Sequence, residues 1–286
     1  MAKKIIAVAM NGMNATPSTR DMDVVYPIGQ FDKFTSRYVE STVQSENRFH
    51  GDEQSCSTLY WHLLHTLDYL SQSFALNPAD DVQILFGRGT LGSSSEEELA
   101  AMLKDTSTMP ANDVFKVIVA KSYGGIDTLK ALQAPGVGDA VGRIDLLILL
   151  DTTGPKLSVR KVSTKNSRGE RLLTIPKFVV RTENIYQREQ RISYKHGYRA
   201  KGRFETEVFN NRLDADQIDG KYYTYPTGSK YFKDPQTSVA QRKLTTNHFD
   251  IEEIVCGVGV VTKHENLGTL HDIIVKGYVQ SLEIDE

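Results

Sequence analysis

The sequence predicts an α/β protein, a three-layer α/β/α sandwich in which helices cover both faces of a mostly parallel central sheet. Apolar runs of strand length recur along the chain up to residue 185. Several of them are separated by segments in which apolar residues recur at helical spacing. Strands that alternate with helices imply parallel pairing through right-handed crossovers. The 286 residues suit one such domain with insertions, so we expect a single domain over residues 1–286.

The strands are predicted first, because continuous apolar runs are typical of strands that are buried on both faces. They are expected over residues 3–10, 81–86, 115–120, 144–150 and 176–185. Helices are expected where leucines and aromatic residues recur over 55–75, from Ser93 to Glu98 onward, and over 126–132. The second of these begins with overlapping Ser-x-x-Glu patterns, which cap helix N-termini. The chain from His248 onward is apolar again and is expected to be helical.

Residues 188–243 have a different character, rich in Tyr, Arg, Lys, Gly and Asp and without strand–helix alternation. We expect them to form a cap or long insertion over the sheet. Tyrosine and arginine suit a recognition surface, so a mobile cap that controls access to a site is the functional hypothesis. A loop braced by aromatic residues, with solvated charges, is the alternative. Basic residues between aromatic ones are also compatible with nucleic-acid stacking, but no defined binding module is present.

The composition excludes several classes of protein. The 34 basic and 36 acidic residues give a net charge of −2, so no nucleic-acid partner is expected. Two cysteines, Cys56 and Cys256, form neither a disulfide framework nor a zinc motif. No apolar run approaches the roughly 20 residues of a membrane span, and the run after Lys4 is too short for a signal peptide. We expect a soluble, cytoplasmic protein, whose oligomeric state the sequence leaves open.

One motif carries chemistry. A predicted buried strand runs into Ala120-Lys121-Ser122-Tyr123-Gly124, and a predicted helix follows. A nucleophilic serine on a sharp strand-to-helix turn needs small residues two positions before and two positions after it, and Ala120 and Gly124 meet that need. The turn holds the serine in a strained backbone conformation and places its hydroxyl at the edge of the sheet. An ordinary turn with a capping serine is the alternative interpretation.

With this motif the sequence resembles the α/β-hydrolase superfamily, in which Gly-x-Ser-x-Gly carries the nucleophile; here Ala120 replaces the first glycine. Weaker similarity links it to lipase-like bacterial phospholipase effectors. The resemblance implies the order serine, acid, histidine along the chain. Asp151 ends the apolar run 144–150 and His248 lies before the last apolar segment, so both fit that order.

Alternatives to both partners remain open. Glu183, near the end of the fifth predicted strand, is the rival to Asp151, because many members of the superfamily take the acid from the following strand. His264 and His271 are alternative bases that lack the flanking pattern. His62 and His65 precede the serine and fit the order poorly.

Two glycine-containing segments remain. The resemblance implies an oxyanion site made by the backbone N–H of Tyr123 and by the loop Asn11-Gly12-Met13-Asn14 after the first strand. Residues 87–92 match the dinucleotide-binding pattern Gly-x-Gly-x-x-Gly, but the acidic residue expected about 20 positions later is missing. A structural glycine-rich turn is therefore favoured over nucleotide binding.

The resemblance implies a serine hydrolase that cleaves a carboxylic ester or thioester of a small molecule or lipid, with Ser122, His248 and Asp151 as its triad. Such an enzyme needs no metal or organic cofactor. A hydrolase-like scaffold that only binds, without turnover, and a nucleotide-binding enzyme that uses residues 87–92 are the alternative functions.

Overall fold

A computed structural model of the chain describes residues 2–12, 58–88, 95–105, 109, 113–188, 197–203, 205–213, 222–224, 241–243, 248, 251, 254–258, 260–261 and 266–283. Its centre is a six-stranded sheet with the order β2-β1-β3-β4-β7-β9, in which every neighbouring pair is parallel. The strands are β1 (Lys4–Asn11), β2 (Val82–Arg88), β3 (Val114–Lys121), β4 (Ile144–Leu150), β7 (Val179–Gln187) and β9 (Glu207–Leu213).

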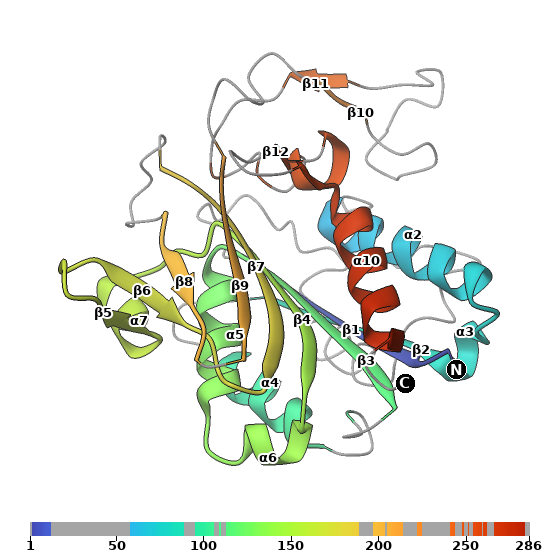
Figure 1. The fold of residues 1–286 in the computed structure, drawn as a ribbon, viewed down its shortest axis with the longest axis horizontal. Helices are drawn as coiled ribbons and strands as arrows, with labels where there is room; N and C mark the ends of the chain where they lie inside the picture. The colour runs from blue at the N-terminus through green and yellow to red at the C-terminus, as the bar shows by residue number, and fades with distance from the viewer. Residues whose placement is uncertain are drawn as a thin grey trace, which may run out of the picture.

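The central strands are apolar on both sides because helices cover both faces of the sheet. All seven residues of β4 are buried, as are six of the eight residues of β3. Two helices that contact each other, α2 (Thr58–Ser73) and α10 (Leu270–Glu283), lie over one face. On the other lie α4 (Ser95–Lys104), α5 (Tyr123–Gln133) and α6 (Val137–Val141), which contact one another (Figure 1). Helix α3 (Pro78–Asp81) leads into β2.

Smaller elements flank this core. A three-stranded sheet, β5 (Ser163–Lys165), β6 (Arg171–Thr174) and β8 (Arg199–Lys201), lies together with helix α7 (Lys156–Lys161) beyond the β9 side of the central sheet (Figure 1). Two short antiparallel pairs join β10 (Tyr222–Thr224) to β11 (Gln241–Lys243) and β12 (Val260–Val261) to β13 (Asn266–Gly268). A π-helical turn spans Ile254–Val258.

The structure confirms the five predicted strands and the parallel sheet, with ends that shift by a few residues. The interval 188–243 differs from expectation, because Glu207–Leu213 pairs with β7 as the sixth strand of the central sheet and so does not belong to a cap. Its sequence, EVFNNRL, is too polar to be predicted as a buried strand. A polar strand of this kind can lie at the edge of a sheet. A cap formed by the rest of the interval stays a prediction. No helix in the described part of the chain is long and apolar enough to cross a membrane.

Candidate active site

The candidate site lies at the carboxyl edge of the central sheet, where β1, β3 and β4 end. After β1 the chain moves to one side, to β2, and after β2 it crosses to the other side, to β3, so the strand order reverses between β1 and β3. In open parallel sheets, ligands bind in the crevice at such a reversal point. Lys121 pairs with Leu150 in the ladder, so the residues that follow them, Ser122 and Asp151, emerge side by side.

Ser122 occupies a sharp turn between β3 and α5. Its backbone has φ 55° and ψ −123°, a strained conformation for a residue with a side chain, which costs about 1–3 kcal/mol. Ser122 is the N-cap residue of α5, yet its side chain makes no capping hydrogen bond. A serine that only terminates a helix uses its hydroxyl for that bond. The alternative of a plain capping serine therefore does not describe this residue.

The hydroxyl of Ser122 instead faces an imidazole. The Nε2 atom of His248 lies 2.8 Å from Ser122 Oγ, and His248 Nδ1 lies 2.8 Å from Asp151 Oδ2. Because the carboxylate can only accept, Nδ1 carries the proton, which leaves Nε2 free to accept the hydroxyl proton of the serine. All three side chains are buried, with Asp151 fully enclosed. The structure thus brings together the three residues that the sequence order had selected.

Asp151 is held by more than the histidine. Its backbone is strained, with φ 42°, and its backbone N–H donates to the Ile185 carbonyl of β7 at 2.7 Å. The buried side chain of Gln187, the last residue of β7, donates from Nε2 to Asp151 Oδ2 at 3.0 Å. The Gln187 backbone N–H lies 3.4 Å from Oδ1. Hydrogen-bond donors therefore face both carboxylate oxygens and hold the carboxylate in position.

Gln187 is a residue that the sequence analysis did not select. A glutamine at the end of a strand carries no distinctive pattern, and only the pairing of β7 with β4 brings it to Asp151. The available signal was its place at the carboxyl end of a strand, since the preceding strand of the central sheet is followed directly by Asp151.

Gly12 closes the site from the side of β1. A Cβ atom on Gly12 would lie 2.6 Å from Ser122 Cβ and 3.1 Å from Ser122 Oγ, so only glycine allows the backbone to pass this close to the hydroxyl. Asn11 is the last residue of β1, which places its backbone at the same edge. Met13 lies outside the described residues. Tyr123 is the first residue of α5, so its backbone N–H belongs to the open end of that helix, where developing negative charge is favoured.

The loop after Asp151 packs tightly on the start of α5. The Thr153 N–H donates to the Ser122 carbonyl at 3.2 Å. A Cβ atom on Gly125 would lie 2.2 Å from Thr152 Oγ1, and one on Gly154 would lie 2.8 Å from the ring of Tyr123. Glycines at both positions let the acid-bearing loop and the nucleophile-bearing helix approach each other.

The rival acid is occupied elsewhere. Glu183 is fully buried in the middle of β7, where its Oε1 accepts from Arg181 at 2.6 Å and its Oε2 accepts from Asn211 at 2.9 Å. Arg181 also stacks on the ring of Phe209. Glu183 therefore braces β7 against β9 through Asn211, and the carboxylate in contact with His248 is that of Asp151.

The other candidate groups lie away from this edge or outside the described residues. His271 on α10 contacts Thr66 Oγ1 at 3.3 Å and packs edge-on against Tyr69. His62 and His65 lie on α2, and His264 lies outside the described residues. Within the Gly-x-Gly-x-x-Gly segment, Gly87 and Arg88 are still part of β2, paired with Met10 and Asn11, while residues 89–92 lie outside the described residues.

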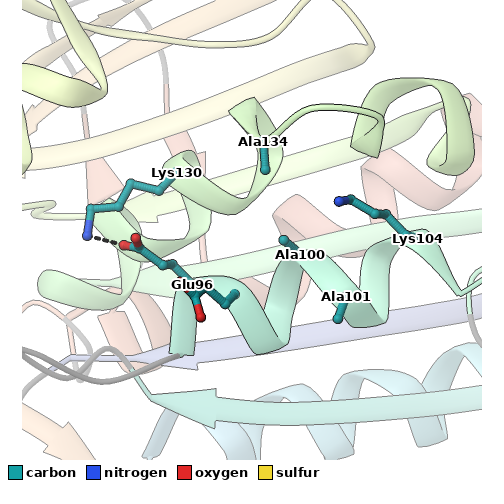
Figure 2. A pocket seen from close by; sticks show the side chains of 7 residues that line it. Glu96, Ala100, Ala101, Lys104, Lys130 and Ala134 are labelled. Atoms are coloured by element: carbon teal, nitrogen blue, oxygen red, sulfur yellow. Dashed lines mark hydrogen bonds and ion pairs between the residues drawn. The ribbon is translucent and has the colours of Figure 1, made fainter.

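A separate cleft of about 350 Å³ lies between α4 and α5 (Figure 2). It is lined by alanines and by charged residues, among them Glu96, Lys104 and Lys130. Burial lowers the pKa of Lys130, but its ion pairs with Glu96 and Asp127 outweigh this and raise the pKa above its usual value. None of the triad residues lines this cleft, which lies toward the far end of α5 from Ser122.

No three His, Cys, Asp or Glu side chains gather as metal ligands in the part of the chain that the structure describes. Comparison with protein-family models, with curated proteins and with solved structures finds no match for this chain, so the site is interpreted from its own geometry.

Proposed function

We propose that this protein is a serine hydrolase that cleaves a carboxylic ester or thioester through an acyl-enzyme intermediate. The observation that carries the proposal is the continuous hydrogen-bonded series Ser122–His248–Asp151, with 2.8 Å at each of its two contacts. A nucleophile, a base in hydrogen-bond reach of it, and an acid that orients the base are the parts that acyl transfer by serine requires.

In the first half of the reaction, Ser122 Oγ attacks the carbonyl carbon of the substrate and its proton passes to His248 Nε2. Asp151 holds the imidazole in the tautomer that accepts at Nε2 and stabilises the positive charge that forms on it. The negative charge on the carbonyl oxygen develops near the N-terminus of α5, where the Tyr123 N–H and the backbone at Gly12 are the proposed donors. His248 then protonates the leaving alcohol or thiol, and the acyl group stays on Ser122.

In the second half, a water molecule takes the place of the leaving group. His248 Nε2 accepts a proton from the water as its oxygen attacks the acyl carbon. Collapse of the second tetrahedral intermediate returns that proton to Ser122 Oγ and releases the carboxylic acid. Both halves use the same groups, so loss of any one of the three affects both.

The test is covalent labelling with a fluorophosphonate, which reacts only with an activated serine. We expect the wild-type protein to be labelled once and Ser122→Ala to remain unlabelled. Ser281→Ala is the matched control, because Ser281 is also buried but donates to the Tyr278 carbonyl on α10, away from the site. It should label like the wild type.

Labelling should also fall in His248→Ala, because the base that activates the serine is removed. A folded wild-type sample that is not labelled, or a Ser122→Ala sample that is labelled as fast as the wild type, would contradict the proposal. The first result would favour a scaffold that binds without turnover.

A further inference from the structure

The charge of this protein is strongly segregated. Residues 155–174 and 199–203, which form α7, β5, β6, β8 and their turns, carry nine basic residues and one acidic residue, Glu170. This basic module has a net charge of +8, so the remainder of the chain carries −10, because the whole chain carries −2. Eight of the nine basic side chains are exposed: Lys156, Arg160, Lys161, Lys165, Arg168, Arg199, Lys201 and Arg203.

The only acidic residue of the module does not neutralise it. Glu170 is half-buried and its Oε1 pairs with Arg188 at 3.2 Å, a cation outside the module. A net charge of +8 gathered in one small module attracts an anionic partner to this part of the surface.

Helix α7 combines this charge with an exposed apolar side chain. Val159 is fully buried and Ser158 faces the core, so Lys156, Arg160, Leu157 and Lys161 occupy one continuous exposed face in that angular order. Leu157 is 72% exposed, the most exposed large apolar residue in the described part of the chain, and it lies between Arg160 and Lys161. An apolar side chain flanked by cations is the pattern of a protein surface that rests on an anionic membrane.

Helix α7 lies next to the candidate site. Thr153, three residues before the first residue of α7, donates its backbone N–H to the Ser122 carbonyl, and Ser158 Oγ of α7 lies 3.2 Å from the hydroxyl of Tyr123. Tyr123 directly follows the nucleophile. Helix α7 therefore packs through Ser158 on the residue next to the nucleophile, and its exposed face lies on the side of the helix away from that contact.

We infer that α7 and the basic module bind the surface of a bilayer that contains anionic lipids, with Leu157 inserted among the headgroups, and that the lipid esters of this bilayer are the substrate class. The membrane attachment stands on charge and exposure alone, whereas the substrate class rests on the proposed ester hydrolysis. Nucleic acid is the less favoured partner, because binding of single strands uses aromatic residues for stacking and the basic module contains none.

The test is co-sedimentation of the full chain with vesicles of phosphatidylcholine alone or with about 30% phosphatidylserine. We expect binding to the anionic vesicles only, and its loss when the salt is raised to about 0.5 M, because salt screens the attraction. The triple variant Lys156→Gln, Arg160→Gln, Lys161→Gln should bind on the order of 100-fold more weakly, about five-fold for each cation removed.

Two matched controls test whether binding depends on the α7 face itself, rather than on the total number of cations or exposed apolar side chains. Lys104→Gln, Lys177→Gln, Lys276→Gln removes three exposed cations that belong neither to the basic module nor to the α7 face, and should bind within about two-fold of the wild type. Leu157→Ser should bind about ten-fold more weakly because less apolar surface is inserted. Val279→Ser, at a side chain that is 38% exposed on α10, should not change binding.

Equal binding by the two triple variants would overturn the inference. So would binding to a duplex RNA that matches the binding to anionic vesicles and is unaffected by Leu157→Ser, which would assign the basic module to nucleic acid. Ser122→Ala should bind vesicles like the wild type, so failure of the hydrolase proposal and failure of membrane binding give different results. With a water-soluble ester, the Leu157 and triple variants should hydrolyse at the wild-type rate. With vesicle lipids they should hydrolyse more slowly.

Discussion

Asp151→Asn is the substitution that tests the proposed triad of Ser122, His248 and Asp151 in most detail. In the protein, Asp151 Oδ2 accepts from both His248 Nδ1 and Gln187 Nε2, at 2.8 and 3.0 Å. If the asparagine amide places its NH₂ group where Oδ2 was, this donor faces two other donors, His248 Nδ1–H and Gln187 Nε2–H. The imidazole then adopts the other tautomer, with its proton on Nε2, and no longer accepts the proton of Ser122.

The opposite orientation of the amide is less damaging but still costly. The NH₂ group would then face only the Gln187 backbone N–H, at the longer distance of 3.4 Å, and His248 would keep its tautomer. The negative charge that stabilises the imidazolium would nevertheless be lost. Since one orientation removes the base and the other removes its stabilisation, we expect kcat to fall about 10³- to 10⁴-fold, which corresponds to about 4–5.5 kcal/mol of activation free energy.

The assay is steady-state hydrolysis of a soluble chromogenic ester, with folding checked by urea unfolding. KM should change little, because the substitution acts on the transition state. Asp145→Asn is the matched control. Asp145 lies near the start of β4, the strand that Asp151 directly follows, where it pairs with Arg143 at 2.7 Å and accepts from the Lys116 N–H. It should reduce stability and leave kcat unchanged. A folded Asp151→Asn protein that loses less than about ten-fold in kcat would refute the reasoning.

Three further predictions concern other contacts. Gly12→Ala should abolish esterase activity in a protein that still folds, because the added Cβ would lie 2.6 Å from Ser122 Cβ; wild-type turnover would show that the backbone need not pass so closely. Gln187→Met should lower kcat by about ten-fold, since a buried donor to the Asp151 carboxylate is lost; an unchanged kcat in steady-state hydrolysis would give Gln187 a packing role only. Burial raises the pKa of the Tyr278 phenol, so the folded state holds this proton more tightly than the unfolded chain and stability falls as pH rises above about 10. Tyr278→Phe should cost about 1 kcal/mol at neutral pH and make this alkaline decline shallower in urea unfolding from pH 8 to 11; an identical decline would contradict the assignment.

The central strands and the candidate triad were predictable because their signals are local. Residues 144–150 are apolar except for Asp145, and a run of that kind forms a strand wherever both sheet faces are covered. Ser122 lies between such a strand and a helix, and small residues flank it. The order serine, acid, histidine then limited the choice of partners, and the structure brings Asp151 and His248 to Ser122.

The features that sequence analysis missed depend on pairing between distant segments. Glu207–Leu213 is half polar, and it becomes a strand because β7 offers an unpaired edge for it. Gln187 acquires its role only when β7 lies beside β4. Lys116 lies within an apolar run, fully enclosed, and its Nζ donates to the Val141 carbonyl at 2.7 Å. Burial lowers the pKa of this lysine, and the local sequence does not indicate that burial.

The charge segregation shows a related limit of whole-chain composition. A net charge of −2 suggests no preference for a charged partner, but it is the sum of a basic module and an acidic remainder. The module becomes visible only when residues 155–174 are joined to residues 199–203 by the pairing of β6 with β8. The net charge of the whole chain therefore does not exclude an anionic partner for one part of the surface.

The most direct measurement of the central claim is acid quenching of the wild-type protein during hydrolysis of p-nitrophenyl acetate, followed by peptide mass mapping. The account predicts one acetyl group per chain, located on Ser122, and a burst of nitrophenol of matching size before steady turnover. Steady turnover without an acetylated peptide, or with the acetyl group on another residue, would contradict it.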